Sequence, residues 1–504
     1  MTPQNPILTD VEENAIPRSS TSESIKQITA DLDSAISMLP GKYTSTADWG
    51  RITSGAAAAL KGRVLLTWAS PLFNRNDQEA RWAEAYQANA EAKTLLEENG
   101  FGLYKVGNLA NGEAWGKMFL AEGSANPEGV MVFGFNNMAA EGNGTKNSGW
   151  EQAVRPRQIN GNGSVSPTLE AMEAFPMKDG KMIGDASSAY TYDLQTFYKN
   201  RDPRFYQTFV YNGAPWPYGG DPNYKHWTYV WKKDAASTQF NASTETAANA
   251  SGIYVKKASN PTASSTSNGS NFSQSGTDYM EIRFAEVLLN LAECEIGTNR
   301  LNEGIEHIKE IRERAGVENL DGDYGLSAAR GDRDKLFAAV LNERRVEFAY
   351  EAKRFWDLRR WLLFDDTYGT VSRLGMEELN GTRRHGVIVS VKTSETGADY
   401  VGTENPFLPR SNGTYPLINR NPATYPDGIA DYNAYLDYLY TNYFEVSVKD
   451  DLDRTNATPS WTFKWYPEYY FFGLNQTILS TSPYLEQTKG WDSLNGMGTF
   501  DPLL

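Results

Sequence analysis

The sequence predicts a mainly α-helical fold, in which two groups of helices form a scaffold and two loop-rich regions decorate it. Apolar residues recur with helical spacing over 20–100 and again over 278–365. Over 101–277 and 366–504, Gly, Asn, Ser, Pro and aromatic residues dominate instead. With 504 residues, 40% of them hydrophobic, the chain can build a sizeable core. We expect a single structural unit over 1–504, with a few short strands in its loop-rich regions.

The first helical group should hold three helices, and the short links between them favour antiparallel hairpins. Residues 1–20 are polar, contain three prolines and are expected to be extended. Helix-capping serines, alanine-rich faces and terminal Pro or Gly residues mark the helices that follow. We expect them at Ser22–Leu39, Arg51–Ala69 and Asp77–Asn99.

In the first loop-rich region, short apolar bursts alternate with turn residues. Gly129–Phe135 and Phe205–Tyr211 are expected to be strands or extended segments. Residues 235–276 are rich in Ser, Thr, Asn and Ala, which favours a long surface loop.

The second helical group is predicted from stripes of apolar residues, such as the one through Met280, Phe284, Leu291 and Cys294. Its helices are expected at Asp278–Gly297, Asn302–Ala315 and Lys335–Phe364. The last region should contain one short helix, at Ala430–Tyr443.

Within the last of these helices, Leu341–Trp361 combines ten charged residues out of 21 with an apolar row. Leu341, Phe348 and Phe355 are spaced seven apart, which is helical spacing with a strongly polar opposite face. No Gly or Pro interrupts the segment. The pattern alone predicts a long amphipathic scaffold helix that packs on one side.

Composition excludes several functional classes. The formal net charge of −15 argues against general affinity for nucleic acid or anionic lipid. A single cysteine, Cys294, rules out an intrachain disulfide and is expected to be buried. His226, His307 and His385 are too far apart to show metal-ligand spacing, and we expect neither a metal nor another cofactor.

The chain shows no targeting or spanning segment. No apolar run reaches the length of a membrane helix. The first 20 residues lack the charged start and apolar stretch of a signal peptide. Composition alone therefore leaves open a cytosolic protein, a mature form or a fragment.

The densest aromatic cluster is the segment 205–231, where large rings alternate with Gly, Pro and Asn. Because rings on such a loop cannot all pack inside, some should line a groove on which the apolar face of a sugar can lie. Trp216 and Tyr218, between Pro and Gly residues, are the rings we expect to be exposed, and Tyr224 and Trp227 are further ligand candidates. Polar anchors nearby are Asn212, Asp221, Asn223 and Lys225.

A structural role is the alternative for part of this cluster. Trp227, Tyr229 and Trp231 alternate as in a half-buried strand, so an equally good interpretation places them in the core. Trp150, in a Gly- and Asn-rich stretch, is a weaker second ligand candidate.

Several segments, taken together and in order, resemble the SusD/RagB family of cell-surface nutrient-binding lipoproteins. The match includes the Ala-rich helix ending in PLFN and the DPR motif at Arg201–Phe205. It continues through three helical motifs, EIRFAEVLLNLAECE at Glu281–Glu295, IKEIRERAG at Ile308–Gly316, and Asn342–Trp361. Each motif alone is weak, whereas the combination is specific and covers most of the chain from about residue 20.

The resemblance implies tetratricopeptide-like helical hairpins, with a ligand face on the loop-rich regions. It implies capture of a glycan at the outer membrane and delivery to a SusC-like TonB-dependent transporter. Family members carry a signal peptide and a lipidated cysteine that this chain lacks, so membrane association is expected only through an anchor absent from the sequence. Trp356, Trp361 and Trp491 lie in scaffold motifs and are expected to be structural.

Non-catalytic glycan binding is therefore the leading functional hypothesis. Peptide binding, as in the RagB branch, is the alternative within the family, and a helical glycoside hydrolase is the alternative outside it. No nucleophile elbow, zinc-protease motif or phosphate loop is present in the sequence, and no pair of carboxylates can be singled out.

Overall fold

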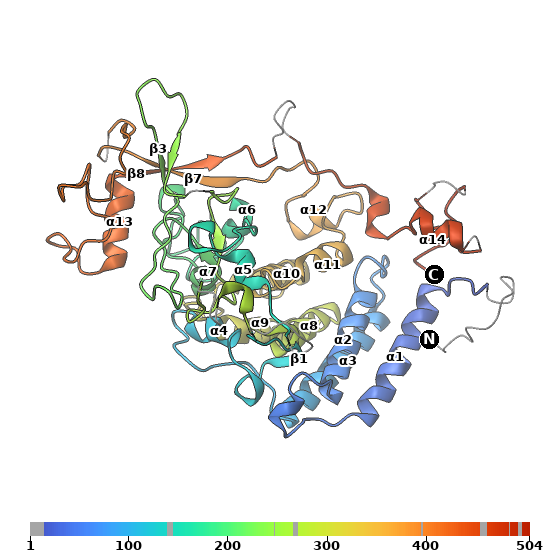
Figure 1. Ribbon diagram of the computed structural model, residues 1–504. Helices are drawn as coiled ribbons and strands as arrows, with labels where there is room; N and C mark the ends of the chain where they lie inside the picture. Colours follow the sequence, from blue (N-terminus) through green and yellow to red (C-terminus); the bar gives the residue numbers. More distant parts are fainter. Residues whose placement is uncertain are drawn as a thin grey trace.

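The computed structural model describes residues 15–138, 145–245, 247–265, 271–394, 397–453, 461–482, 484–491 and 496–504. It is mainly helical with a few short strands, which confirms the predicted fold class. Figure 1 shows the first helices on one side of the molecule, the second group at its centre and the C-terminal region along the top. The extended conformation expected for 1–14 lies outside the described residues.

The first helical group comprises α1 (Thr21–Met38), α2 (Ser54–Ala69) and α3 (Glu79–Glu98). Ser20 and Glu23 form a capping box that fixes the start of α1. Small residues let α2 approach α3 closely. The amide of Asn89 in α3 donates to the carbonyl of Gly62 at 3.1 Å, and a Cβ at Gly62 would collide with the Asn89 side chain.

The second group comprises α8 (Phe284–Gly297), α9 (Leu301–Ala315), α10 (Arg333–Glu347) and α11 (Arg354–Arg360). Every residue of α8 is buried, including Cys294 as predicted. The largest core cluster lies between these helices and α2 and α3.

The helix expected from Asp278 begins later, because its first turn is a strand. β6 (Tyr279–Arg283) pairs antiparallel with β1 (Gly129–Phe133), which confirms the first predicted strand. Met280 and Ile282 are buried while Tyr279 and Glu281 are half-buried, so the segment has the period of a strand.

The long helix expected over Lys335–Phe364 is broken between α10 and α11. Tyr350 and Ala352 have left-handed backbones, with φ of 63° and 59°. The break arises from distant cations. The Lys257 ammonium donates to the carbonyls of Glu347 and Ala349, at 3.0 and 2.7 Å, and Arg283 donates to that of Glu347 at 2.8 Å. These carbonyls therefore need no further turn of helix to satisfy them.

Because of this break, the apolar row of the segment does not stay on one face. Leu341 and Phe348 are buried, whereas Phe355 is exposed. The polar side is not a solvated face either, since Glu343, Arg344 and Asp357 are buried.

The first loop-rich region carries short helices and two-residue strands. They are α4 (Glu113–Met118), α5 (Trp150–Val154), α6 (Leu169–Glu173), α7 (Pro203–Thr208), β2 (Phe209–Val210), β3 (Val230–Trp231), β4 (Ala242–Ser243) and β5 (Tyr254–Val255). The strand expected at Phe205–Tyr211 is thus mostly the helix α7. Asp202 caps this helix and Pro203 begins it. These two residues are a helix-start signal, but the run of apolar residues after them favours a strand.

The C-terminal region spans the molecule. It contains α12 (Thr370–Leu374), β7 (Gly386–Val391), α13 (Tyr432–Asn442), β8 (Phe444–Lys449) and α14 (Gln476–Thr481). Strands β7 and β8 complete a four-stranded sheet in the order β4-β3-β7-β8. Figure 1 shows α13 at one end and α14 at the other. Near α14, the Ser22 amide at the start of α1 donates to the Leu504 carbonyl at 3.0 Å.

A buried network of ion pairs joins the first loop-rich region to the second group of helices, and we call it the central ion network. Its members are Glu128, Arg204, Arg283, Arg314 and Glu347, all essentially without solvent contact. Arg283 bridges Glu128 and Glu347, each at 2.7 Å, and Arg204 reaches Glu347 at 2.8 Å. Three cations hold the pKa of Glu347 well below its usual range despite burial, which alone would raise it.

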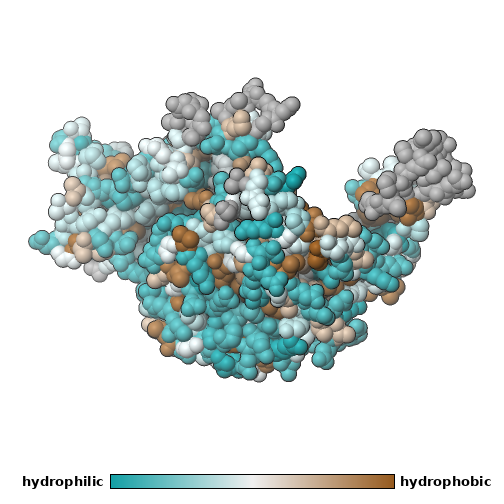
Figure 2. Space-filling model, turned by 90° about the horizontal axis from the view of Figure 1, so that it is seen from below, coloured by the Kyte–Doolittle hydropathy of each residue, from teal (hydrophilic) through white to brown (hydrophobic). Residues whose placement is uncertain are grey.

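The surface is mostly hydrophilic. Figure 2 shows hydrophobic residues in small scattered groups, some of them beside the hollow that separates the rounded body from the arm at the right. Within the described ranges, we find no helix with the length and apolar character needed to span a bilayer.

Candidate functional site

The structure buries Trp216, so the expectation that this ring is exposed is wrong. Its side chain is 2% exposed. The indole Nε1 donates to the Ser259 hydroxyl at 2.9 Å, and the Arg155 guanidinium lies 4.7 Å from the ring centre. A polar partner and a cation from distant segments thus satisfy the indole inside the fold.

Tyr218 and Tyr224 remain at the edge of this cluster and are half-buried. Their rings meet edge to face at 5.6 Å, and Tyr218 also packs on Phe272 at 5.6 Å. The Tyr224 hydroxyl lies 3.0 Å from Nδ1 of His226. The two tyrosines therefore form a fixed aromatic edge rather than an open groove.

Trp227 belongs to the second core cluster, and both Trp227 and Asn212 are shielded from solvent. The Asn212 side-chain oxygen accepts from the Thr228 amide at 3.0 Å. Asn212 and Trp227 therefore hold the loop in place rather than present a surface. Lys225 stays half-buried, with its ammonium 4.3 Å from the Tyr432 ring.

The second candidate of the sequence, Trp150, lines a cavity of about 300 Å³, which we call the Trp150 pocket. Its walls come from residues distant in sequence: Phe119, Ser148, Trp150, Lys257, Ala258, Thr277, Asp278, Tyr279, Met280, Tyr350, Glu351 and Ala352. The break between α10 and α11 forms one side of it. A mostly apolar cavity of this size with a few polar groups is typical of a small-molecule site.

A buried ion pair lies at the Trp150 pocket. The Lys257 ammonium and a Glu351 oxygen are 2.6 Å apart, and Arg283 holds the other Glu351 oxygen at 2.8 Å. Burial lowers the pKa of Lys257 to about 8, although Glu351 opposes this. Both charged groups present fixed polarity in a cavity that four aromatic residues also line.

The aromatic walls of the pocket are held rigidly. The Trp150 indole donates to the Lys257 carbonyl at 2.8 Å, which fixes its plane. The Tyr279 hydroxyl donates to Glu281 at 3.2 Å. Its ring lies 6.3 Å from that of Phe133, which is exposed beside it.

Three non-glycine residues of the pocket have left-handed backbones. Ala258, Tyr350 and Ala352 have φ between 59° and 63°. Each such residue costs about 1–2 kcal/mol, and such residues cluster at functional sites where surrounding contacts enforce them. Their convergence on one cavity marks it as the best candidate site.

A second cavity of about 360 Å³ adjoins this pocket, and Ala352 lines both. We call it the Trp356 cleft. Trp356 is 53% exposed, so the expectation that it is structural is wrong, because the helix break turns the start of α11 outward. Trp361, at the end of the same segment, is fully buried as expected of a structural residue.

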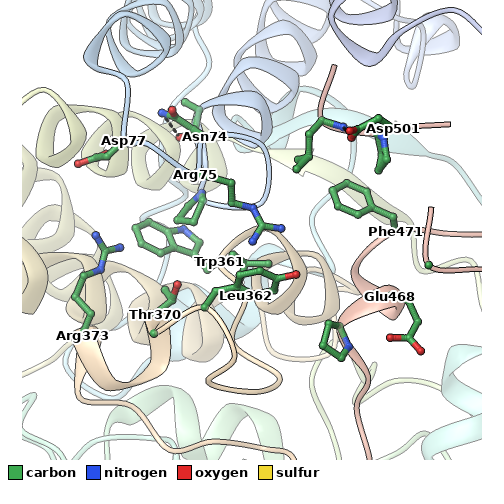
Figure 3. Close-up of a pocket in the computed structure, with 18 of the residues that line it drawn as sticks. Asn74, Arg75, Asp77, Trp361, Leu362, Thr370, Arg373, Glu468, Phe471 and Asp501 are labelled. Carbon is green, nitrogen blue, oxygen red and sulfur yellow. Dashed lines mark hydrogen bonds between the residues drawn. The ribbon is translucent and has the colours of Figure 1, made fainter. Parts of the chain in front are cut away.

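A third cavity, of about 760 Å³, lies between the α2–α3 turn and the C-terminal region. Figure 3 shows Arg75 projecting into it, between Trp361 on the scaffold side and Phe471 on the C-terminal side. Arg75 packs on the Tyr368 ring at 3.9 Å. Lys489, which also lines this cavity, is paired with Asp501 at 2.9 Å.

Metal binding has no geometric support in the part of the chain that the structure describes. There, no three His, Cys, Asp or Glu side chains come together as metal ligands would.

Comparison with known proteins gives consistent matches. A family model described as the SusD family matches residues 127–491. The SusD-like protein P2 of Formosa agariphila is 34% identical over 104 residues, so the aligned stretch spans 20% of this chain and 20% of that relative.

Two solved structures from Bacteroides fragilis share the fold. A SusD-like protein has a TM-score of 0.61 at 22% identity, covering 95% of this chain and 72% of that one. A SusD-like carbohydrate binding protein has a TM-score of 0.50 at 20% identity, covering 75% and 64%.

Proposed function

Because the chain belongs to the SusD family, we propose that it binds oligo- or polysaccharide at the cell surface without cleaving it and delivers it to a SusC-like TonB-dependent outer-membrane transporter. One structural relative is described as a carbohydrate binding protein, which supports the ligand class. The cell-surface location and the transporter are proposed from the family resemblance.

The Trp150 pocket is the observation that carries this proposal. A pyranose has an apolar C–H face that packs on an indole, and hydroxyls that need polar anchors. Trp150 and Tyr279 supply rings, while Ser148, Thr277 and Asp278 supply oxygens within the same cavity. The fixed indole plane favours a preorganised site, which lowers the entropic cost of binding.

The carboxylates of the pocket are poorly suited to hydrolysis. Glycosidases need one carboxylic acid with a raised pKa. Burial would raise the pKa of Glu351, but Arg283 and Lys257 lower it below its usual value. Asp278 already accepts from the Trp49 indole at 2.7 Å and from the Phe135 amide at 2.8 Å. Glu351 is therefore suited to accepting hydrogen bonds rather than donating a proton, and both oxygens of Asp278 already accept hydrogen bonds within the protein.

Calorimetric titration with a panel of neutral plant, host and storage glycans tests the function. We expect Trp150→Ala to weaken binding at least about fivefold, the loss typical of one aromatic contact. Tyr218→Ala is the matched variant for the aromatic segment, and Trp461→Ala controls for loss of an exposed indole elsewhere.

The results separate the hypotheses. A loss confined to Tyr218→Ala would move the ligand to the Tyr218–Tyr224 edge. Release of reducing sugar would identify a hydrolase, and binding of oligopeptides alone would identify a peptide-binding member of the family. Either of the last two outcomes rejects glycan capture.

A further inference from the structure

The Trp356 cleft is lined by more basic than acidic side chains. Its basic residues are Arg63, Arg344, Lys353, Arg359 and Arg360, and its acidic residues are Glu281, Glu286 and Asp357. Most of these charges neutralise one another. Arg63 pairs with Glu281 and Glu286, each at 2.6 Å, and Lys353 pairs with Glu281 at 3.0 Å. Asp357 pairs with Arg344 at 3.0 Å and with Arg360 at 2.8 Å.

Arg359 differs from its neighbours because it has no carboxylate partner among the residues that the structure describes. It is only 8% exposed. One guanidinium nitrogen donates to the Tyr470 carbonyl, while its buried Nε has no hydrogen-bond partner within that part of the chain. Burial lowers its pKa to about 10, still far above neutrality, so the side chain is a cation.

A buried cation without a counter-ion is costly, and the cost falls when an anion approaches it. Arginine suits this role because its planar fork binds carboxylate and sulfate oxygens in pairs. The unpartnered Nε of Arg359 therefore points to a ligand with a negative group.

Aromatic rings surround this cation. The guanidinium lies 4.0 Å from the Phe472 ring centre and 5.5 Å from that of Trp356. Trp356 and Phe472 are both more than half exposed, and their planes cross at 84°. The cleft thus offers a flat ring beside a buried positive charge.

We propose that the Trp356 cleft binds an acidic sugar residue, whose carboxylate or sulfate ester pairs with Arg359 while its pyranose face packs on Trp356. This inference rests on the proposed function, since it assigns a ligand class to a second subsite. Ala352 lines both cavities, so the cleft lies directly beside the Trp150 pocket. The overall charge of −15 does not oppose this, because local charge governs a partly enclosed site.

Ligand-observed NMR titration with glucose, glucuronate and glucose 6-sulfate tests the inference. We expect at least one charged sugar to bind at least about tenfold more tightly than glucose, and added salt to weaken that preference. The tighter of the two charged probes identifies carboxylate or sulfate as the recognised group.

Variants assign the preference to the cleft. Arg359→Gln should reduce binding of the charged sugar to the level of glucose, and Trp356→Ala should weaken all three probes. Trp461→Ala controls for removal of an exposed indole. If Arg359→Gln does not fold, Arg359→Lys, which keeps the charge but loses the planar fork, should reduce the preference in part.

Equal affinities for the three probes, no binding of any, or a preference that survives Arg359→Gln would each overturn the inference. The proposed function fails separately. A protein that binds neutral polysaccharide but shows no preference for charged probes retains that function and loses only this subsite.

Discussion

Trp216 shows how a single residue can look functional in the sequence and be structural in the fold. Pro and Gly flank it, as they flank many exposed rings. Its partners, however, are Ser259, 43 residues away, and Arg155, 61 residues away, whose guanidinium donates to the Trp216 carbonyl. No local pattern encodes such partners.

Replacing Trp216 should therefore affect stability. We expect Trp216→Ala to lower the free energy of unfolding by about 3–5 kcal/mol, the usual cost of emptying a large core site. Urea denaturation measures this, and the half-exposed Trp461→Ala, with an expected loss below about 1 kcal/mol, is the control. A small loss for Trp216→Ala would mean that the ring is not packed as described.

At the scale of elements, apolar spacing predicted several helices to within a few residues, as with α1, α3, α9 and α13. It failed where tertiary contacts override local pattern. The break after α10 depends on Lys257 and Arg283, which lie 64 to 92 residues from the carbonyls that they cap. Strand β6 was missed although its own period of two was visible.

The same reasoning explains what could be predicted of the candidate site. Trp150 was singled out because Gly and Asn residues surround it. The rest of the Trp150 pocket could not be foreseen, since its walls come from segments that only the fold brings together. Arg359 lies in the segment predicted to be a scaffold helix, and the sequence cannot show that its side chain lacks a carboxylate partner.

The helix break can be tested at Ala352, whose backbone is left-handed while its side chain is exposed. Ala352→Val should destabilise the protein by about 1–2 kcal/mol, because a branched side chain clashes in this conformation. Ala352→Gly should be nearly neutral, since relief of strain offsets the entropy that glycine loses. Ala83→Val in the exposed face of α3 is the control, expected to cost about 0.6 kcal/mol. Equal losses of stability for Ala352→Val and Ala83→Val would contradict a strained backbone at Ala352.

The α8–α9 hairpin predicts a dependence of stability on pH. His307 in α9 lies 3.6 Å from Glu295 in α8 and 4.0 Å from Glu310. Burial alone would lower the pKa of His307, but the two carboxylates outweigh it and raise the pKa to about 9. Because the folded-state pKa is above the unfolded one, the stabilisation is complete below about pH 6.5 and is lost as pH rises towards 9.

Urea unfolding at pH 6.5 and pH 9 measures this effect. Relative to His307→Gln, the wild-type protein should lose about 1–3 kcal/mol between these two values. Parallel losses in both proteins would show that His307 is not charged in the folded state.

At the scale of the whole molecule, two features join distant parts. The C-terminal region runs from α13 at one end to α14 at the other, and its last residues meet the start of α1 (Figure 1). Arg18, just before α1, packs on the Phe500 ring at 3.4 Å and donates to the Thr488 hydroxyl at 3.0 Å. The central ion network likewise joins segments that are distant in sequence, in the interior of the protein.

Glu347 is the residue of the central ion network whose substitution should lower the stability of the whole protein most. Glu347→Gln leaves Arg204, Arg283 and Arg314 short of one negative charge in a buried site, and we expect a loss of about 3–5 kcal/mol. Glu306→Gln, which removes an exposed partner of Lys309, should change stability by less than about 0.5 kcal/mol. Chemical denaturation of both variants gives the comparison.

We expect the central ion network also to affect how quickly the protein reaches its native state. Arg314 and Glu128 are 186 residues apart in sequence, and Arg204 and Glu347 are 143 apart. Contacts of such separation form slowly, because the entropic cost of closing a long loop comes before the contact can stabilise the chain. Until then each charge stays hydrated or meets a wrong partner, so completion of the network should be a late step in refolding, and its rate should depend on ionic strength.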